Sequence, residues 1–265
     1  MAASNLPAMK TNPKFIFFTD FDGTITLQDS NDFMTDTIGF GTDLRKQGNK
    51  DVLVGKKSFR QSFKEMMDSI TTPYPECIEY LVKNVKLDPG FNDYLTWALA
   101  NDIPTVIVSS GMEPIIRAVL TNLVGENAKK LDIVSNHVRA RPGKTLEDEA
   151  GWELVFHDES DFGHDKSLTI RPYAQLPADQ RPTLFYAGDG VSDLSAAKET
   201  DLLFAKKGHD LIQFCVTEKI PFTVFDTWKE IHSEVKRIVE GKVSVQDAAK
   251  EGVEAWRKGE AGLPN

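Results

Sequence analysis

Cysteine is scarce in this chain of 265 residues, which contains only Cys77 and Cys215. The two lie far apart in the sequence and belong to no CxxC or other metal-ligand spacing. This pattern argues against a disulfide framework and against a cysteine-based metal centre. Such cysteine usage is typical of a reducing compartment, so we expect a cytoplasmic protein.

Long hydrophobic runs and basic clusters are missing as well. No segment approaches the roughly 20 apolar residues of a membrane span, and residues 1–14 hold no apolar stretch typical of a secretory signal. Lys and Arg number 31 against 40 Asp and Glu, which gives a net charge of -9. This charge repels polyanions, so we expect neither a nucleic-acid nor a membrane partner.

The composition that remains is that of a globular protein, with 40% hydrophobic and 27% charged residues. Strand-like apolar runs occur at residues 15–19, 105–109, 183–187 and 202–205, and helical patterns follow most of them. This alternation is typical of a parallel sheet covered by helices on both faces. The sequence therefore predicts an α/β fold with a doubly wound, Rossmann-like parallel sheet.

A long insertion separates the first two predicted strands, far beyond the dozen or so residues that a crossover needs. Apolar residues recur within it at helical spacing, for example over 59–70. We therefore predict a helical cap domain at residues 28–88 and a core formed by residues 13–27 and 89–265. Two further strand-like runs within 131–157 predict an antiparallel excursion, whose role the sequence does not reveal.

Two acids follow the first strand, in the segment Asp20-Phe21-Asp22-Gly23. A carboxylate in line can displace an alcohol from phosphorus, while a second group protonates the leaving oxygen and later activates water. Asp20 suits the first role and Asp22 the second. Taken alone, a turn that uses Asp and Gly for its geometry explains this pattern equally well.

The second strand also ends in polar residues, Ser109-Ser110-Gly111, just before a predicted helix. Hydroxyl and backbone N–H groups at such a place can hold phosphate oxygens. Ser109 would donate from its side chain, and Ser110 and Gly111 from the backbone. An ordinary helix N-cap is the alternative use of these serines.

Lys166 lies at the predicted start of a later helix. A cation there would offset the negative charge of Asp20 and of the phosphoryl group in transfer. Because most lysines are surface residues, Lys166 indicates a phosphoryl-transfer site only in combination with the other motifs. Lys144 and His164 are the alternatives, and order along the chain favours Lys166.

Asp189 and Asp193 follow the third strand, in GDGVSDLSAA. Carboxylate oxygens at the end of a buried strand suit Mg²⁺, which takes one or two protein carboxylates and keeps several waters. We expect Asp189 to bind the ion directly and Asp193 to orient a metal-bound water or Lys166 from behind. Together the four pieces indicate one phosphoryl-transfer site.

In this order, DFDGT, VSSG, a lysine and GDGVSDLSAA resemble the four motifs of the haloacid dehalogenase-like phosphatase superfamily. The resemblance spans nearly the whole chain and implies an aspartyl-phosphate mechanism, a Mg²⁺ cofactor and a helical C1-type cap. It implies that Asp20 is the nucleophile, Asp22 the acid/base, and Ser109 and Lys166 phosphate ligands. It further implies that Asp20, the carbonyl of Asp22 and Asp189 hold the metal.

Within this superfamily the chain is most similar to the fungal polyol-phosphate phosphatases, relatives of phosphoserine phosphatase and of the methylthio-diketopentane phosphate phosphatase. The similarity rests on FTDFDGTITLQDSNDFMTDTIGFG, PTVIVSSGMEPII, FGHDKS and GDGVSDLSAAKETDLLFAK. It implies a small-molecule phosphomonoester substrate, such as glycerol or erythritol phosphate. We expect a monomer or a homodimer.

The cap departs from the phosphoserine phosphatase pattern. Those enzymes carry a glutamate nine residues after the nucleophile, which meets the substrate amine, and a cap arginine that clamps the carboxylate. This chain has Asp29 at the first position and Met66 near the second, with Arg60 a turn or two earlier. Because carboxylates accept O–H bonds well, we expect a hydroxyl-rich leaving group contacted by Asp29, Asn31, Asp32 and Arg60. Helix capping is the alternative use of Asp29.

Two other classes fit the sequence less well. Receiver domains of signalling proteins also place acids, a hydroxyl and a lysine at strand ends, but they lack the second acid two residues after the phosphoacceptor and lack so large a cap. A catalytically silent binding protein would not need all four motifs intact. We therefore predict a Mg²⁺-dependent phosphomonoesterase, with phosphoserine or a methylthio-diketopentane phosphate as alternative substrates and phosphomutase chemistry still open.

Overall fold

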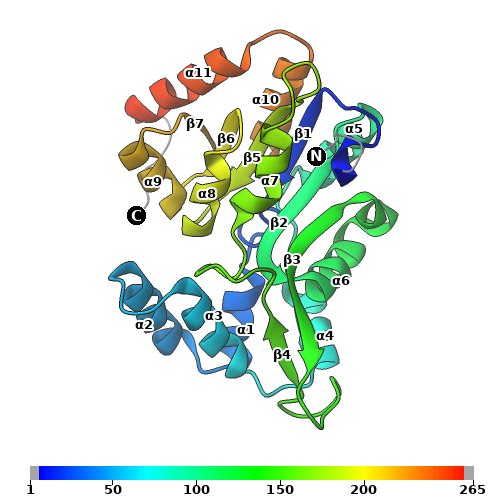
Figure 1. The fold of residues 1–265 in the computed structure, drawn as a ribbon, viewed down its shortest axis with the longest axis vertical. Coiled ribbons are helices and arrows are strands. Elements are labelled where there is room, and N and C mark those ends of the chain that lie inside the picture. The colour runs from blue at the N-terminus through cyan, green and yellow to red at the C-terminus, as the bar shows by residue number, and fades with distance from the viewer. Residues whose placement is uncertain (1–5, 260–265) are drawn as a thin grey trace.

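A seven-stranded sheet with the strand order β4-β3-β2-β1-β5-β6-β7 forms the centre of the computed structural model, which describes residues 6–259 (Figure 1). Neighbouring strands pair in parallel, except that β4 runs antiparallel to β3. The predicted doubly wound α/β sheet is therefore confirmed, with an antiparallel strand at one edge. The strands are β1 (Phe15–Thr19), β2 (Thr105–Met112), β3 (Asp132–Ala140), β4 (Trp152–Val155), β5 (Thr183–Gly188), β6 (Leu202–Lys206) and β7 (Phe222–Phe225).

Strand β1 lies in the middle of the sheet because its side chains are apolar on both faces. Phe17 packs into one hydrophobic cluster, and Ile16 and Phe18 pack into a second cluster on the opposite face. Such an unbroken apolar run is typical of a parallel strand that helices cover on both sides. The residues that follow β1 therefore emerge at the centre of one edge of the sheet.

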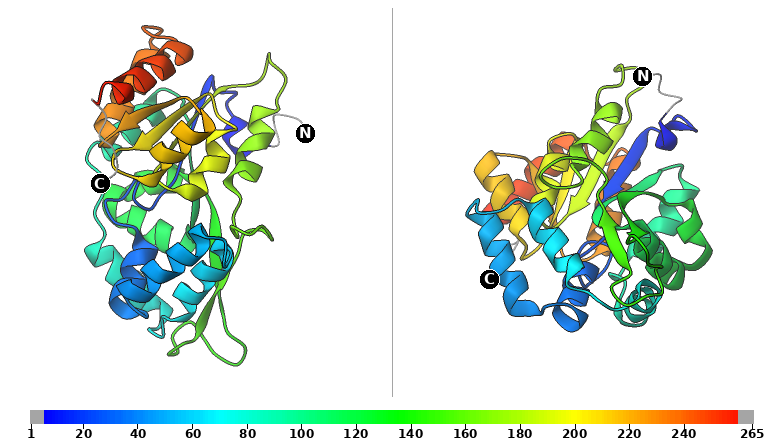
Figure 2. Two further views of the ribbon diagram at one scale, coloured as in Figure 1. Left: turned by 90° about the vertical axis from the view of Figure 1, so that its left-hand side faces the viewer. Right: turned by 60° about the horizontal axis from the view of Figure 1, so that its bottom comes forward.

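Helices cover both faces of this sheet, as the views in Figure 2 show. One face carries residues of α5 (Phe91–Ala100), α6 (Glu113–Val124) and α10 (Trp228–Val239) in its buried cluster. The other face carries α7 (Lys166–Ala174), α8 (Leu194–Ala197) and α9 (Asp210–Glu218). Helix α11 (Val245–Arg257) lies along β7, where Gly252 approaches the carbonyl of Phe222 too closely for any larger residue.

Four helices fill the long segment between β1 and α5: α1 (Ser30–Ile38), α2 (Thr42–Leu53), α3 (Phe59–Asp68) and α4 (Tyr74–Asn84). In Figure 1, α1, α2 and α3 gather below the sheet. The chain enters and leaves this segment side by side, since Thr26 and Leu87 form an antiparallel bridge. We keep residues 28–88 as the proposed cap.

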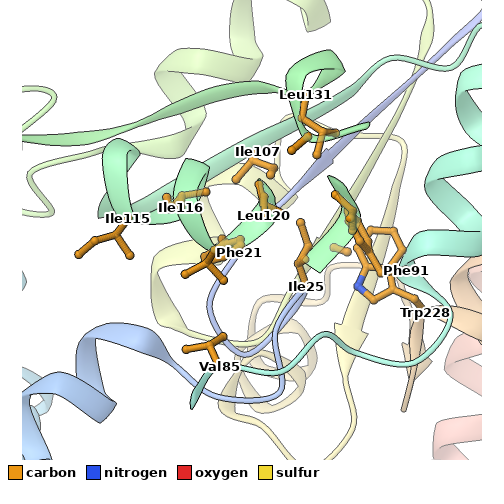
Figure 3. Close-up of a cluster of buried hydrophobic side chains, with 14 of the residues drawn as sticks. Phe21, Ile25, Val85, Phe91, Ile107, Ile115, Ile116, Leu120, Leu131 and Trp228 are labelled. Atoms are coloured by element: carbon orange, nitrogen blue, oxygen red, sulfur yellow. The ribbon is translucent and has the colours of Figure 1, made fainter. Parts of the chain in front are cut away.

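The cap and the core share one hydrophobic cluster. Phe63, Met67 and Leu81 of the cap helices belong to the same buried cluster as Phe17 of the central strand. Figure 3 shows part of it, where Val85 at the end of the cap faces residues of the core. Because apolar contacts stabilise in proportion to the area they bury, this continuity ties the cap firmly to the sheet.

The excursion at residues 131–157 is the antiparallel pair β3–β4, as predicted, and it holds the cap from outside. The amide N–H of Ala150 donates to Thr71 O (2.6 Å), and Trp152 Nε1 donates to Thr72 O (3.0 Å). Arg141 also pairs with Asp68 of α3 at 2.7 Å. The hairpin, whose role the sequence left open, is thus a strap between core and cap.

None of the described helices is long and apolar enough to cross a membrane.

Candidate active site

A cavity of about 440 Å³ lies between the cap and the ends of the parallel strands. Its walls include most of the residues expected at the site: Asp20, Asp22, Asp29, Ser109, Ser110, Gly111 and Asp189. Asp29 reaches the cavity from the start of α1, and the others meet there because the carboxyl ends of β1, β2 and β5 share one edge of the sheet. Lys166 lies just behind this wall, fully buried.

Asp20 is placed by the middle strand and by one cation. Its backbone N–H donates to Ala187 O of β5 (2.9 Å), and its Oδ1 accepts from the N–H of Phe21 (2.6 Å). Its other oxygen, Oδ2, lies 2.9 Å from Lys166 Nζ. Burial raises the pKa of Asp20 well above its usual value, and Lys166 opposes this shift. The lysine therefore favours the ionised form that a nucleophile needs.

Lys166 is held by Asp193 from the side opposite Asp20. The distance from Lys166 Nζ to Asp193 Oδ1 is 2.5 Å, and Asp193 Oδ2 accepts from the N–H groups of Asp189 (2.9 Å) and Gly190 (3.0 Å). Burial alone would lower the pKa of Lys166, but Asp193 and Asp20 raise it above its usual value. Lys166 is thus a permanent cation, and Asp193 orients it.

Asp22 faces the first helix of the cap. Its Oδ1 accepts from the N–H of Ser30 (2.7 Å) and its Oδ2 from Asn31 Nδ2 (2.9 Å). Burial raises the pKa of Asp22 to about 8, and the nearby charge of Asp29 contributes in the same direction. A carboxyl group with such a pKa holds a proton near neutral pH and suits general acid catalysis.

The acids after β1 and β5 form the cluster in which a metal would bind. One carboxylate oxygen from each of Asp20, Asp189 and Asp193 lies within 4.8 Å of the others. Burial raises the pKa of Asp189, although a hydrogen bond from His209 opposes the shift. Asp20 and Asp189 line the cavity, whereas Asp193 is fully buried and does not, so Asp20 and Asp189 are the better ligands. This set of hard oxygen donors fits Mg²⁺.

Gly23 shows how tightly the two acidic turns pack. Its φ is +70°, and a Cβ atom there would lie 2.4 Å from Asp189 Oδ2. A residue with a side chain would be strained by the backbone and would displace Asp189. The glycine after Asp22 is therefore needed for the approach of Asp189 to the end of β1.

The last residues of β2, where its pairing with β3 shifts register, differ in one detail from the expected phosphate cradle. The N–H of Gly111 donates to Ser109 Oγ (2.9 Å), so this donor is already engaged. The hydroxyl of Ser110, in contrast, is buried and has no hydrogen-bond partner among the described residues. A buried polar atom without a partner costs free energy, which an incoming phosphate oxygen would relieve.

The cap residues expected to recognise the leaving group divide into two groups. Asp29, Asn31 and Asp32 line the cavity, and so does Met66, which stands near the position of the cap arginine of phosphoserine phosphatases. Asp29 also caps α1, since its Oδ1 accepts from the N–H groups of Asn31 and Asp32 at 2.8 Å each. Asp29 is therefore a helix cap that also lines the cavity, and its contact with the leaving group stays a prediction.

Arg60 does not line the cavity, contrary to the expectation of a substrate contact. Its Nη1 donates to Asp158 O (2.5 Å) and Ser160 O (3.3 Å), and its guanidinium lies 4.2 Å from the centre of the Phe156 ring. Lys144, the alternative cation, is exposed and donates to Glu149 O. Arg60 instead joins α3 to the loop that leads to Lys166.

Sequence reasoning missed an apolar wall of the cavity. Aromatic side chains come from α3, from the loop before α7 and from α9, and they are Phe59, Phe63, Phe162 and Phe214. The helical spacing of Phe59 and Phe63 indicates cap core, and no local pattern distinguishes Phe162 or Phe214. His209, whose Nδ1 lies 3.1 Å from Asp189 Oδ2, was missed for the same reason.

The sequence matches the haloacid dehalogenase-like hydrolase family over residues 17–198. It is 51% identical over 241 residues to the polyol phosphate phosphatase PYP1 of Saccharomyces cerevisiae, covering 88% of this chain and 98% of that protein. It is also 51% identical over 231 residues to the Pdp3-interacting factor 1 of Schizosaccharomyces pombe, covering 87% and 98%. A Bacillus cereus 2-hydroxy-3-keto-5-methylthiopentenyl-1-phosphate phosphatase is 24% identical over 229 residues, covering 85% and 97%.

Among solved structures, a substrate-bound phosphoserine phosphatase superposes with a TM-score of 0.58 and 18% identity. The match covers 84% of this chain and 98% of that one. At this identity the likeness concerns the fold, and it agrees with the parallel sheet and its helices described above.

Proposed function

Because this chain belongs to the haloacid dehalogenase-like hydrolase family, we propose that it is a Mg²⁺-dependent phosphomonoesterase for small polyol or sugar-alcohol phosphates. The reaction would pass through an aspartyl-phosphate intermediate on Asp20. The observation that carries the proposal is the grouping of Asp20, Asp22 and Ser109 around one cavity, with Lys166 2.9 Å from Asp20 Oδ2. We place the enzyme in the cytoplasm, as a monomer or homodimer.

Asp20 and Asp22 divide the chemistry between them. An oxygen of Asp20 attacks phosphorus, the bond from phosphorus to the alcohol breaks, and the alcohol oxygen takes the proton of Asp22. Asp22 then removes a proton from water, which attacks the aspartyl phosphate and frees Asp20. Ser109, Ser110 and Lys166 hold the phosphate oxygens. Mg²⁺, held by Asp20, Asp189 and the carbonyl of Asp22, would neutralise phosphate charge.

The cavity favours an uncharged, hydroxyl-bearing leaving group. Asp29 and Asp32 line its cap side, and no lysine or arginine is among the described residues that line it. Arg45 pairs with Asp32 at 2.5 Å, so Asp29 is the carboxylate whose charge would repel a leaving group that carries a carboxylate, such as serine. Hydroxyls can donate to these carboxylates, and the carbon chain can pack on the aromatic wall.

A second candidate is favoured by that aromatic wall. Phe59, Phe63 and Phe162 offer more apolar surface than a short polyol needs. A phosphate ester with an apolar tail, such as the methylthio-diketopentane type, would bury that tail against them. Comparing second-order rate constants across glycerol, tetritol, pentitol, serine and methylthio-bearing phosphates distinguishes the two candidates.

The covalent step is tested with Asp20→Asn, which should abolish phosphate release while the far-UV circular dichroism spectrum stays unchanged. Acid-quenched wild type should carry phosphate on the peptide that contains Asp20, and EDTA should stop turnover. Asp210→Asn is the matched control, because Asp210 also lines the cavity but belongs to α9. Substantial turnover by Asp20→Asn, or phosphate on another residue, would refute the mechanism. An isomeric product without free phosphate would indicate a phosphomutase.

A further inference from the structure

The direction of the Asp22 side chain is set from the cap. Asp22 belongs to the turn after β1, whereas the donors to its two oxygens, Ser30 N–H and Asn31 Nδ2, belong to consecutive residues of α1. These bonds of 2.7 and 2.9 Å cross from the core to the first helix of the cap. The group expected to move protons is therefore held by the domain that faces the leaving alcohol.

The two oxygens of Asp22 differ in position. A Cβ atom on Gly111 would lie 3.1 Å from Asp22 Oδ2 and 3.2 Å from Ser109 Oγ. Oδ2 is therefore the oxygen beside Ser109 and Gly111 at the end of β2. Oδ1 is turned toward the backbone of Ser30. Only Oδ2 is placed to exchange a proton with an oxygen on the phosphorus.

The two groups that donate hydrogen bonds to Asp22 also differ in whether they can accept one. The backbone N–H of Ser30 can only donate, whereas the amide of Asn31 can turn and present either an N–H or its carbonyl oxygen. Asn31 is 5% exposed and lines the cavity, and its amide oxygen accepts no hydrogen bond from the described residues. The Asn31 amide can thus pair with Asp22 Oδ2 whether or not this oxygen carries a proton.

We propose that Asn31 is a positioning residue for phosphoryl transfer, whose amide aims Asp22 Oδ2 at the oxygen of the leaving alcohol. The inference rests on the proposed function. As the bond from Asp20 to phosphorus forms and the bond to the alcohol breaks, the released electron pair stays on the alcohol oxygen, which takes the proton of Asp22 Oδ2. Asn31 then donates an N–H to the carboxylate that remains.

This role depends on the leaving group. An alkoxide is strongly basic and needs the proton as it departs, whereas nitrophenolate departs readily without one. Loss of Asn31 should therefore slow transfer from an alkyl phosphate and spare transfer from an aryl phosphate. A change that only disturbed the fold of the site would slow both.

The test is rapid acid-quench measurement of phosphoenzyme formation with Mg²⁺ present. Asn31→Leu should slow formation from glycerol phosphate by roughly 10- to 100-fold, and from 4-nitrophenyl phosphate by less than about threefold. Asn31→Ser, which keeps a shorter donor, should recover part of the rate with glycerol phosphate. If the leucine variant does not fold, the serine variant alone still permits the comparison of the two esters.

Thr35→Val is the matched control, because Thr35 is buried on the same helix and bonds the backbone carbonyl of Asn31 at 2.8 Å. Thr35→Val should change the rate of phosphoenzyme formation from both esters by the same factor. Equal slowing of both esters by the Asn31 variants, or no slowing, overturns the role of Asn31 and leaves the proposed function intact. A wild type that forms no phosphoenzyme from either ester contradicts the proposed function, and the role of Asn31 with it.

Discussion

The ring of His164 donates from Nδ1 to the backbone carbonyl oxygen of Ser109 over 2.8 Å. His164 lies two residues before Lys166, so this bond holds the lysine segment against the phosphate-binding end of β2. The ring is 1% exposed, and burial lowers its pKa to about 4. His164 is therefore neutral near pH 7, and it is not the cation that its position in the sequence also allowed.

The first prediction concerns the stability that this neutral ring makes dependent on pH. The unfolded chain binds a proton at His164 below about pH 6.5, whereas the folded protein does so only near pH 4. The contribution of the neutral His164 ring to the free energy of unfolding is therefore present above pH 6.5 and is lost as the pH falls toward 4. Relative to His164→Gln, wild type should lose roughly 2–3 kcal/mol between about pH 7 and pH 4.5 in urea unfolding.

The exposed His137 supplies the control for this measurement. His137→Gln should follow wild type at both pH values. A difference between wild type and His164→Gln that does not change with pH would contradict the neutral, buried ring. At pH 7, the glutamine variant should itself be less stable by about 1–2 kcal/mol, because the bond to Ser109 is lost.

The second prediction concerns the buried cation. Lys166→Met leaves the carboxylates of Asp20 and Asp193 buried without their shared partner. We expect the free energy of unfolding to fall by about 3–5 kcal/mol without Mg²⁺, and turnover to be lost. Lys198→Met is the control, since its pair with Glu218 is half exposed, and its effect should stay within about 0.5 kcal/mol. A loss below about 1 kcal/mol for Lys166→Met would contradict this account.

The third prediction tests whether Arg60 stabilises the fold or binds the substrate. Arg60→Met removes the bonds to the carbonyls of Asp158 and Ser160 and the contact with Phe156. The free energy of unfolding should fall by roughly 1–3 kcal/mol, while KM for glycerol phosphate changes by less than about threefold. Lys57→Met is the control, because it removes an ion pair with Glu65, which belongs to α3 as Arg60 does. A KM raised tenfold or more would restore Arg60 as a substrate ligand.

The fourth prediction tests whether Asp29 binds substrate hydroxyls in addition to capping α1. Asparagine caps helices as well as aspartate does, so Asp29→Asn should leave the free energy of unfolding within about 0.5 kcal/mol of wild type. The variant loses the charge that accepts substrate hydroxyls, so KM for erythritol phosphate should rise roughly tenfold. KM for 4-nitrophenyl phosphate, which has no such hydroxyls, should stay near the wild-type value. Equal effects on both substrates would leave Asp29 as a helix cap alone.

Much of the fold follows from local signals. The apolar runs at 15–19, 183–187 and 202–205 became β1, β5 and β6 almost to the residue, because a strand buried on both faces needs an unbroken apolar run. Residues 131–157 formed the predicted antiparallel pair. The excursion proved to be a strap on the cap, however, because its partners Thr71 and Thr72 are about 80 residues away in sequence.

The sequence by itself determined where the chemical groups stand along the strands. Asp20 and Asp189 follow parallel strands, Ser109 lies near the end of another, and parallel strands of one sheet end at the same edge. Only the tertiary structure decided which partner each side chain meets. Arg60 turns to carbonyls 98 and 100 residues away, and Phe162 and Phe214 enter the cavity from separate elements. Capping and periodicity act within a few residues, whereas such contacts depend on how the whole chain packs.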